Sequence, residues 1–168
     1  NLKSIAELPE KCWKVVPHEK PGCQYLTKAY IGDQPTTLML DTGSSVNSIP
    51  EDTLVNILNV YKSKGIPMGN PEHPVYALEK WQSAEYVCGV AEGKRVPLLG
   101  AAVLKVTMPR CGTDTGPSIY CRFKIMKSGS TDWVPTILGG RALDCPEKGG
   151  LGFMPGPISY ALTGLGIQ

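Results

Sequence analysis

A single carboxylate follows an apolar run in residues 38–45, whose sequence is Leu-Met-Leu-Asp-Thr-Gly-Ser-Ser. A charge directly after a buried strand is costly unless the group is protonated or accepts several hydrogen bonds. The hydroxyls of Thr42 and Ser44 are donors within reach of Asp41, and Gly43 lets the backbone turn tightly beside a ligand. This pattern indicates a tuned carboxylic acid. An Asx-type turn at a strand end also explains a bare Asp-Thr-Gly triplet, so the surroundings must decide.

The residues around Asp41 predict a hairpin before it and a helix after it. Residues 25–31 and 36–40 are rich in β-branched, aromatic and aliphatic side chains, and Gly-Asp-Gln-Pro at 32–35 supplies a turn between them. Apolar residues at helical spacing predict one amphipathic helix over 50–64, with acidic residues near its start and lysines near its end. Asp41 is therefore expected at the point where a strand gives way to a loop.

Further strands are expected along the rest of the chain. Residues 86–90 and 94–99 predict a second hairpin, because the glycine between them can adopt a positive φ at the tip. The apolar runs 102–108 and 119–126 predict two more strands joined by a polar turn, and another apolar run ends at 137–140. The sequence thus predicts many short strands and one helix.

The composition agrees with one small, mainly β domain. With 168 residues, 42% of them hydrophobic and 19% charged, the chain can bury a core, and bulk disorder, a coiled coil and a membrane span are excluded. The 19 glycines and 15 prolines show no periodic repeat and disfavour a helical bundle. We divide the chain into an N-terminal arm (1–24), a domain (25–145) and a C-terminal tail (146–168), whose hydrophobic residues are too many for a solvated linker.

The charge and the metal-ligating residues exclude other classes of function. A formal charge of +2 is too small for the phosphate neutralisation that drives nucleic-acid binding. The six cysteines form no Cys-x-x-Cys pair, and His18 and His73 each stand alone, so we expect no metal, no cofactor and no membrane or nucleic-acid partner. The chain begins with Asn1 and has no basic-then-apolar leader, so we interpret it as a processed piece of a longer protein. Its cellular compartment is left undetermined, with the cytoplasm favoured.

The motifs around Asp41 resemble, in order and spacing, the retropepsin-like aspartic proteases, most closely those of gypsy-type retrotransposon polyproteins. The Asp-Thr-Gly triplet follows a hairpin and precedes two serines and a helix. A second element of the family pattern, two apolar residues and a glycine, follows later in the chain as Ile137-Leu138-Gly139. The resemblance covers residues 25–143. It implies a closed barrel with a flap hairpin and one or two short helices, and a protease domain over 25–145.

The resemblance also implies site residues and an activity. Asp41 would be the catalytic aspartate of an aspartic-type endopeptidase that cleaves extended peptides or a polyprotein. The residues implied to support the active site, beneath or beside the aspartate, are Thr42, Gly43, Ser44, Ile137, Leu138 and Gly139. The residues implied to form the substrate-binding flap are Val90, Ala91, Glu92, Gly93 and Lys94.

One motif in so short a chain predicts a site shared between two copies. Asp114-Thr115-Gly116 repeats the triplet, but it follows polar residues and precedes a proline, so we expect an exposed hairpin turn there. We therefore predict a homodimer in which two copies of Asp41 share one proton and activate a water molecule. The tail over 146–168 is a candidate for the dimer-forming segment.

Two positions depart from the family pattern. Many members have an acidic residue four positions after the catalytic aspartate and an arginine after the glycine of the second element, where the two can pair. This chain has Ser45 and Gly140 there, while Arg141 stands one position late. Because both partners are missing together, we expect an alternative packing. Two other hypotheses remain: an inactive retropepsin-like dimerisation or peptide-binding domain, and a half lobe of a pepsin-like enzyme, against which the closing element at 137–139 argues.

Overall fold

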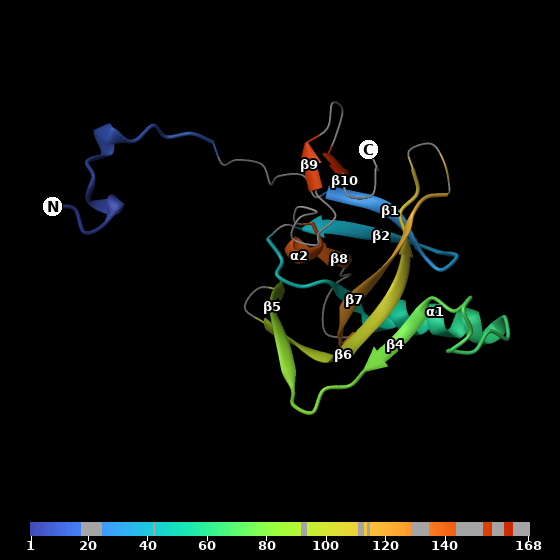
Figure 1. The fold of residues 1–168 in the computed structure, drawn as a ribbon. Coiled ribbons are helices and arrows are strands. Elements are labelled where there is room, and N and C mark those ends of the chain that lie inside the picture. Colours follow the sequence, from blue (N-terminus) through green and yellow to red (C-terminus); the bar gives the residue numbers. More distant parts are fainter. Residues whose placement is uncertain are drawn as a thin grey trace.

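The computed structural model describes residues 1–17, 25–41, 43–91, 94–110, 113, 115–128, 135–143, 153–155 and 160–162. For residues 87–91, 94, 141, 153–155 and 160–162 it describes the backbone alone. Most of the described chain between residues 25 and 143 is β-strand, with one long helix beside the strands (Figure 1). The mainly β fold predicted from the sequence is confirmed.

The bounds of the elements follow the predicted runs closely. The strands are β1 (Tyr25–Ile31), β2 (Gln34–Asp41), β3 (Ser48–Pro50), β4 (Val75–Glu79), β5 (Glu85–Ala91), β6 (Lys94–Thr107), β7 (Ser118–Met126), β8 (Thr136–Gly139), β9 (Phe153–Pro155) and β10 (Tyr160–Leu162). The helices are α1 (Glu51–Ser63) and α2 (Gly140–Leu143), and two 3-10 turns span Ile5–Glu7 and Glu10–Cys12. Strands β3, β4, β9 and β10 were not expected.

The strands close on one another in a hydrogen-bonded ring. Its order is β1, β2, β8, β3, β7 and β6, and β6 pairs again with β1. Strands β4 and β5 both pair with β6, and β9 and β10 form a separate two-stranded sheet. The β2–β8 and β3–β7 pairs are parallel, so strands from distant parts of the chain end side by side.

Strand β6 corrects one prediction. We expected separate strands over 94–99 and 102–108, but β6 runs unbroken through both. Gly100 has a φ of 150°, and the register with β7 shifts between Leu98 and Gly100. This glycine therefore makes a bulge that bends the strand without ending it. A Cβ atom at Gly100 would overlap the carbonyl oxygen of Glu79 in β4.

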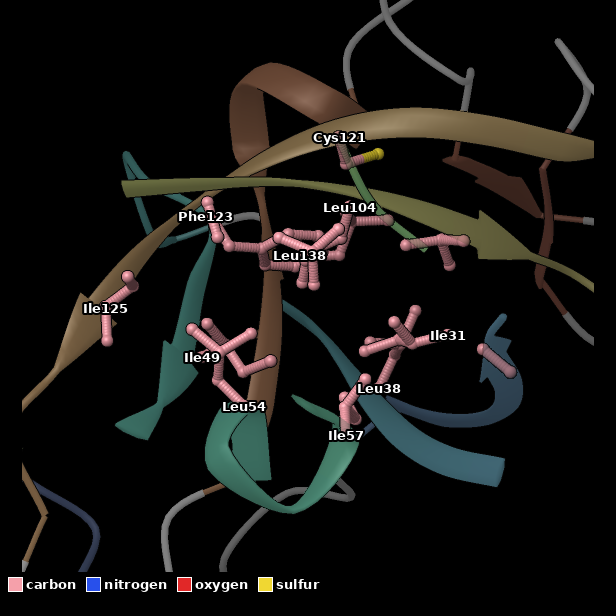
Figure 2. Packing of buried hydrophobic residues seen from close by; sticks show 14 of the residues in the cluster. Ile31, Leu38, Ile49, Leu54, Ile57, Leu104, Cys121, Phe123, Ile125 and Leu138 are labelled. Atoms are coloured by element: carbon pink, nitrogen blue, oxygen red, sulfur yellow. The ribbon is translucent and has the colours of Figure 1, made fainter. Parts of the chain in front are cut away.

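The core fills the ring and is covered on one side by α1. Figure 2 shows side chains of this core converging from several strands. The large side chains that are fully buried include Ile31, Leu38, Ile49, Leu104, Phe123 and Leu138. From α1, Leu54, Ile57 and Tyr61 are buried at positions that share one helical face. Burying each large apolar side chain stabilises the fold by about 1.5–3 kcal/mol, so this cluster holds the ring and the helix together.

The N-terminal segment contrasts with the ring. Every residue of 1–17 is exposed except Leu8, which is partly buried, and this segment leads away from the strands in Figure 1. The predicted boundary at residue 24 falls in 18–24, outside the described residues, so the division into arm, domain and tail stays a prediction. Among the described residues, the helices are all too short or too polar to cross a membrane.

The turn between β1 and β2 is fixed to α1 through Asp33. Its carboxylate accepts hydrogen bonds from the Gln34 side-chain amide (2.8 Å) and the Tyr61 hydroxyl (2.8 Å), and it pairs with Lys64. The Asp33 N–H donates to the same Tyr61 hydroxyl at 2.9 Å. Gly32, with a φ of 64°, gives the turn its shape. The hydrogen bonds from Gln34, and then from Lys64, lower the pKa of Asp33 to about 2.

Replacing Asp33 by asparagine should lower the free energy of unfolding at neutral pH by about 0.5–1 kcal/mol, because water screens this half-exposed ion pair. The pKa of Asp33 falls from 3.8 to about 2 on folding, so the carboxylate stabilises the fold above pH 3.8. That contribution is lost as the pH falls through about 2. Urea unfolding at several pH values should show wild type and Asp33→Asn converging in acid. A difference independent of pH would contradict this.

Candidate active site

Asp41 lies at the carboxyl end of β2, where its neighbour in the parallel strand β8 is Gly139. Its side chain is half-buried. The Gly43 N–H donates to Asp41 Oδ1 at 2.9 Å, and the Ser44 N–H donates to the Asp41 carbonyl at 3.2 Å. The carboxylate thus receives a backbone donor from the loop that follows it, which is the contact that a charge at the end of a buried strand requires.

Ser44 does not act on the carboxylate as the sequence suggested. Its hydroxyl donates to the Val46 carbonyl at 2.9 Å and accepts from the Val46 N–H at 3.4 Å. The hydroxyl of Ser44 therefore closes a turn within its own loop. Its predicted role in supporting the active site stays a prediction. Thr42 lies outside the described residues, and its predicted supporting role stays a prediction.

Strand β8 lies beside the strand that carries Asp41. Ile137 is in register with Met39 and Leu138 with Leu40, and both β8 side chains are buried. Gly139 has no room for a side chain: a Cβ atom there would overlap the Val46 carbonyl and would lie 2.9 Å from the Ser44 carbonyl oxygen. The loop after Asp41 is thus packed directly on the backbone of Gly139.

Two hydrogen bonds join this loop to the end of β8. The Gly139 N–H donates to Asn47 Oδ1 at 2.8 Å, and the Gly140 N–H donates to the Ser44 carbonyl at 2.6 Å. Ser45, at the position where the resemblance stated above implies an acid, is exposed. Sequence reasoning missed Asn47, because an asparagine in a loop carries no signal that separates it from an ordinary turn residue.

The predicted flap falls on the hairpin of β5 and β6. Val90 and Ala91 are in β5, Lys94 is in β6, and Ala91 is in register with Lys94. Glu92 and Gly93 lie outside the described residues. Whether this hairpin closes over Asp41 stays a prediction.

The second Asp-Thr-Gly triplet lies in the connection between β6 and β7. Asp114 is outside the described residues, so the exposed turn expected for it stays a prediction. The Arg110 N–H donates to the Thr115 carbonyl at 2.9 Å, and Thr115 is exposed. The described residues Arg110 and Thr115 thus pair with each other between two strands, whereas Asp41 ends a strand that packs in the core.

Two other side chains with possible acid-base or nucleophilic chemistry, His73 and Cys121, are buried in the fold. His73 is buried, and its Nδ1 accepts from the Val75 N–H at 3.1 Å; burial lowers the pKa of His73. Burial raises the pKa of the Cys121 thiol to about 11, so this thiol stays protonated at neutral pH. Within the described residues, no group of three or more His, Cys, Asp or Glu could hold a metal ion.

A cavity of about 740 Å³ borders the loop that follows Asp41. The loop residues Ser45, Val46 and Asn47 line one part of it, and Trp81 and Lys124 are among its other lining residues. Lys124 Nζ lies 5.2 Å from the centre of the Trp81 ring. Asp41 is not among the described lining residues, so this cavity neighbours the candidate catalytic group and does not contain it.

The chain is similar to solved structures of known proteins. No protein-family model matches the chain, and no curated protein does. The structure is similar to the crystal structure of the retroviral protease-like domain of Ddi1 from Leishmania major, at 14% identity over 73% of this chain and 77% of that one, with a TM-score of 0.43. It is also similar to EIAV protease complexed with the inhibitor HBY-793, at 16% identity over 80% of this chain and 96% of that one, with a TM-score of 0.39.

Replacing Gly139 by alanine tests the packing of the loop on β8. The new methyl group would overlap the Val46 carbonyl, so we expect a loss of about 1–3 kcal/mol in the free energy of unfolding. Urea unfolding measures the loss, and a change in the amide signals of residues 43–47 would locate it. An unfolding curve that overlays that of the wild type would contradict the described packing.

Proposed function

We propose that the protein is an aspartic endopeptidase that acts as a homodimer on extended peptide or polyprotein segments. The observation that carries the proposal is the setting of Asp41: a half-buried carboxylate at the end of β2, in register with Gly139 and bonded by the Gly43 N–H. A single carboxylate does not readily serve as general base and general acid in the same step. A second copy of the chain supplies the other one.

Two copies of Asp41 facing each other across a two-fold axis explain the chemistry. At a separation of about 3 Å the two carboxylates cannot both ionise, so they share one proton. The ionised member takes a proton from a water molecule between them as the water oxygen attacks the scissile carbonyl carbon. The protonated member gives its proton to the carbonyl oxygen, and a tetrahedral diol forms. A proton then passes to the amide nitrogen, the C–N bond breaks, and the carboxyl and amine products leave.

The other predicted site residues bind and position the peptide. Gly43 offers backbone groups close to the substrate, and Thr42 supports the loop from each copy. The hairpin over 90–94 covers an extended peptide, which pairs through its main chain as an added strand does. The tail over 146–168, in which β9 and β10 pair with each other, is the proposed dimer-forming segment.

Loss of the Asp41 carboxylate should abolish cleavage. Asp41→Asn removes the proton acceptor and should lower kcat/KM by at least about 10²–10⁴-fold. Mass spectrometry of a peptide mixture incubated between about pH 3 and pH 7 measures this and shows where cleavage occurs. Asp114→Asn, in the other Asp-Thr-Gly triplet, is the matched control and should stay active. A statine-type mimic of the transition state should inhibit the wild type.

The result also separates the proposal from its alternative. Cleavage that survives in Asp41→Asn would rule out the mechanism. A wild type that binds the statine-type mimic or peptides but cleaves nothing over the whole pH range would favour an inactive peptide-binding or dimerisation domain.

A shared site predicts a specific response to mixing. Asp41→Asn chains added to wild-type chains should pair with them, so equal amounts that exchange freely leave only about one quarter of dimers with two wild-type chains. Cleavage per wild-type chain should therefore fall as the variant is added, whereas added Asp114→Asn should not reduce it. Cleavage independent of added Asp41→Asn, together with a strict monomer in sedimentation, would contradict a shared site.

A further inference from the structure

Asn47 connects three parts of the fold next to Asp41. Its Oδ1 accepts from the Gly139 N–H at 2.8 Å, and its Nδ2 donates to the Arg122 carbonyl at 3.1 Å. Its own carbonyl accepts from the Lys124 N–H at 2.9 Å. One asparagine at the end of the loop is therefore bonded to β8 through its Oδ1 and to β7 through its other two bonds.

The bond to Gly139 is the one that bears on Asp41. Gly139 is the residue of β8 in register with Asp41, and its backbone lies against the loop so closely that a Cβ atom would overlap the Val46 carbonyl. The next residue, Gly140, donates to the Ser44 carbonyl. The segment between Asp41 and Asn47 is thus hydrogen-bonded, at Ser44 and at Asn47, to the end of β8 and the residue that follows it. A shift of Gly139 away from Asn47 would move the loop that supplies the Gly43 N–H to the carboxylate.

The side chain of Asn47 makes this attachment without charge. Ser45 and Gly140 stand at the two positions where the resemblance described in the sequence analysis implies an acid and an arginine. A neutral amide can both accept from one strand and donate to another, which neither an acid nor an arginine alone can do. The chain thereby links β8 and β7 through one residue of the loop.

We propose that Asn47 is a positioning residue for Asp41, acting through the hydrogen bond from the Gly139 N–H to its Oδ1. The bond fixes the end of β8 against the loop, and the loop in turn holds the Gly43 N–H on the carboxylate. This inference rests on the proposed peptidase function for its effect on the reaction, but the placement of the loop can be measured without it.

Two variants at residue 47 separate the two side-chain bonds. Asn47→Leu keeps a similar shape and loses both bonds. Asn47→Asp also loses the donor to the Arg122 carbonyl but keeps an oxygen acceptor for the Gly139 N–H. The same two substitutions at Asn56, which is exposed on α1, serve as controls for the changes in residue type.

The kcat of peptide cleavage should differ between the two Asn47 variants. Asn47→Leu should lower kcat by about 10–100-fold, as expected when a reacting group is displaced by a fraction of an ångström to one ångström, with KM changed by less than about twofold. Asn47→Asp should recover about tenfold of that loss, and both Asn56 variants should match the wild type. Equal kcat values for Asn47→Leu and Asn47→Asp, or a wild-type kcat in Asn47→Leu, would overturn the proposal.

Amide hydrogen exchange tests the placement independently of activity. Exchange at Gly139 and Gly43 should be faster in Asn47→Leu than in the wild type, and Asn47→Asp should restore protection at both. If the wild type cleaves no peptide, the proposed function has failed, and the exchange rates still decide the positioning. Unchanged exchange at Gly43 in Asn47→Leu would overturn it, as would faster exchange throughout the core, which indicates a general loss of stability.

Discussion

The hydrogen bond between the Gly43 N–H and the Asp41 carboxylate is the contact on which the site depends. A carboxylate at the end of a strand that packs in the core must find donors nearby, and the tight loop over 43–47 supplies one. This loop is itself held in place by β8. The backbone of Gly139 packs against the loop, and the Gly139 N–H donates to the side chain of Asn47 at the end of the loop. The glycines of this region are therefore required by close backbone contact as well as by turn geometry.

Strand β2 relates this site to the rest of the fold. It begins beside Asp33, which is bonded to Tyr61 of α1, and it ends at Asp41. Between these points Leu38 and Leu40 enter the core, where β8 lies alongside. The helix, the core and the parallel partner strand thus all restrain the strand that presents the carboxylate.

Local patterns in the sequence were sufficient to predict most of the elements that surround Asp41. The hairpin before Asp41, helix α1 and the apolar run of β8 each show a period or a turn signal within a few residues. The role of Asn47 could not be predicted, because its partner Gly139 is 92 residues away and the contact depends on the order of strands in the ring. The hydroxyl of Ser44, which was expected within reach of Asp41, donates instead to the Val46 carbonyl of its own loop. The break expected near residue 100 was wrong because a glycine within a strand can bend it without interrupting the pairing.

The continuity of β6 couples the β5–β6 hairpin to the protein interior. Its first half pairs with β5, and its second half pairs with β4 and β1 and contributes Ala102, Leu104 and Val106 to the core. The half of β6 that forms the hairpin is thus continuous with the half that packs in the core, and Gly100, the bulged glycine, lies between the two halves. The bulge at Gly100 therefore contributes to the angle at which the hairpin leaves the ring, although this glycine is distant in sequence from Asp41.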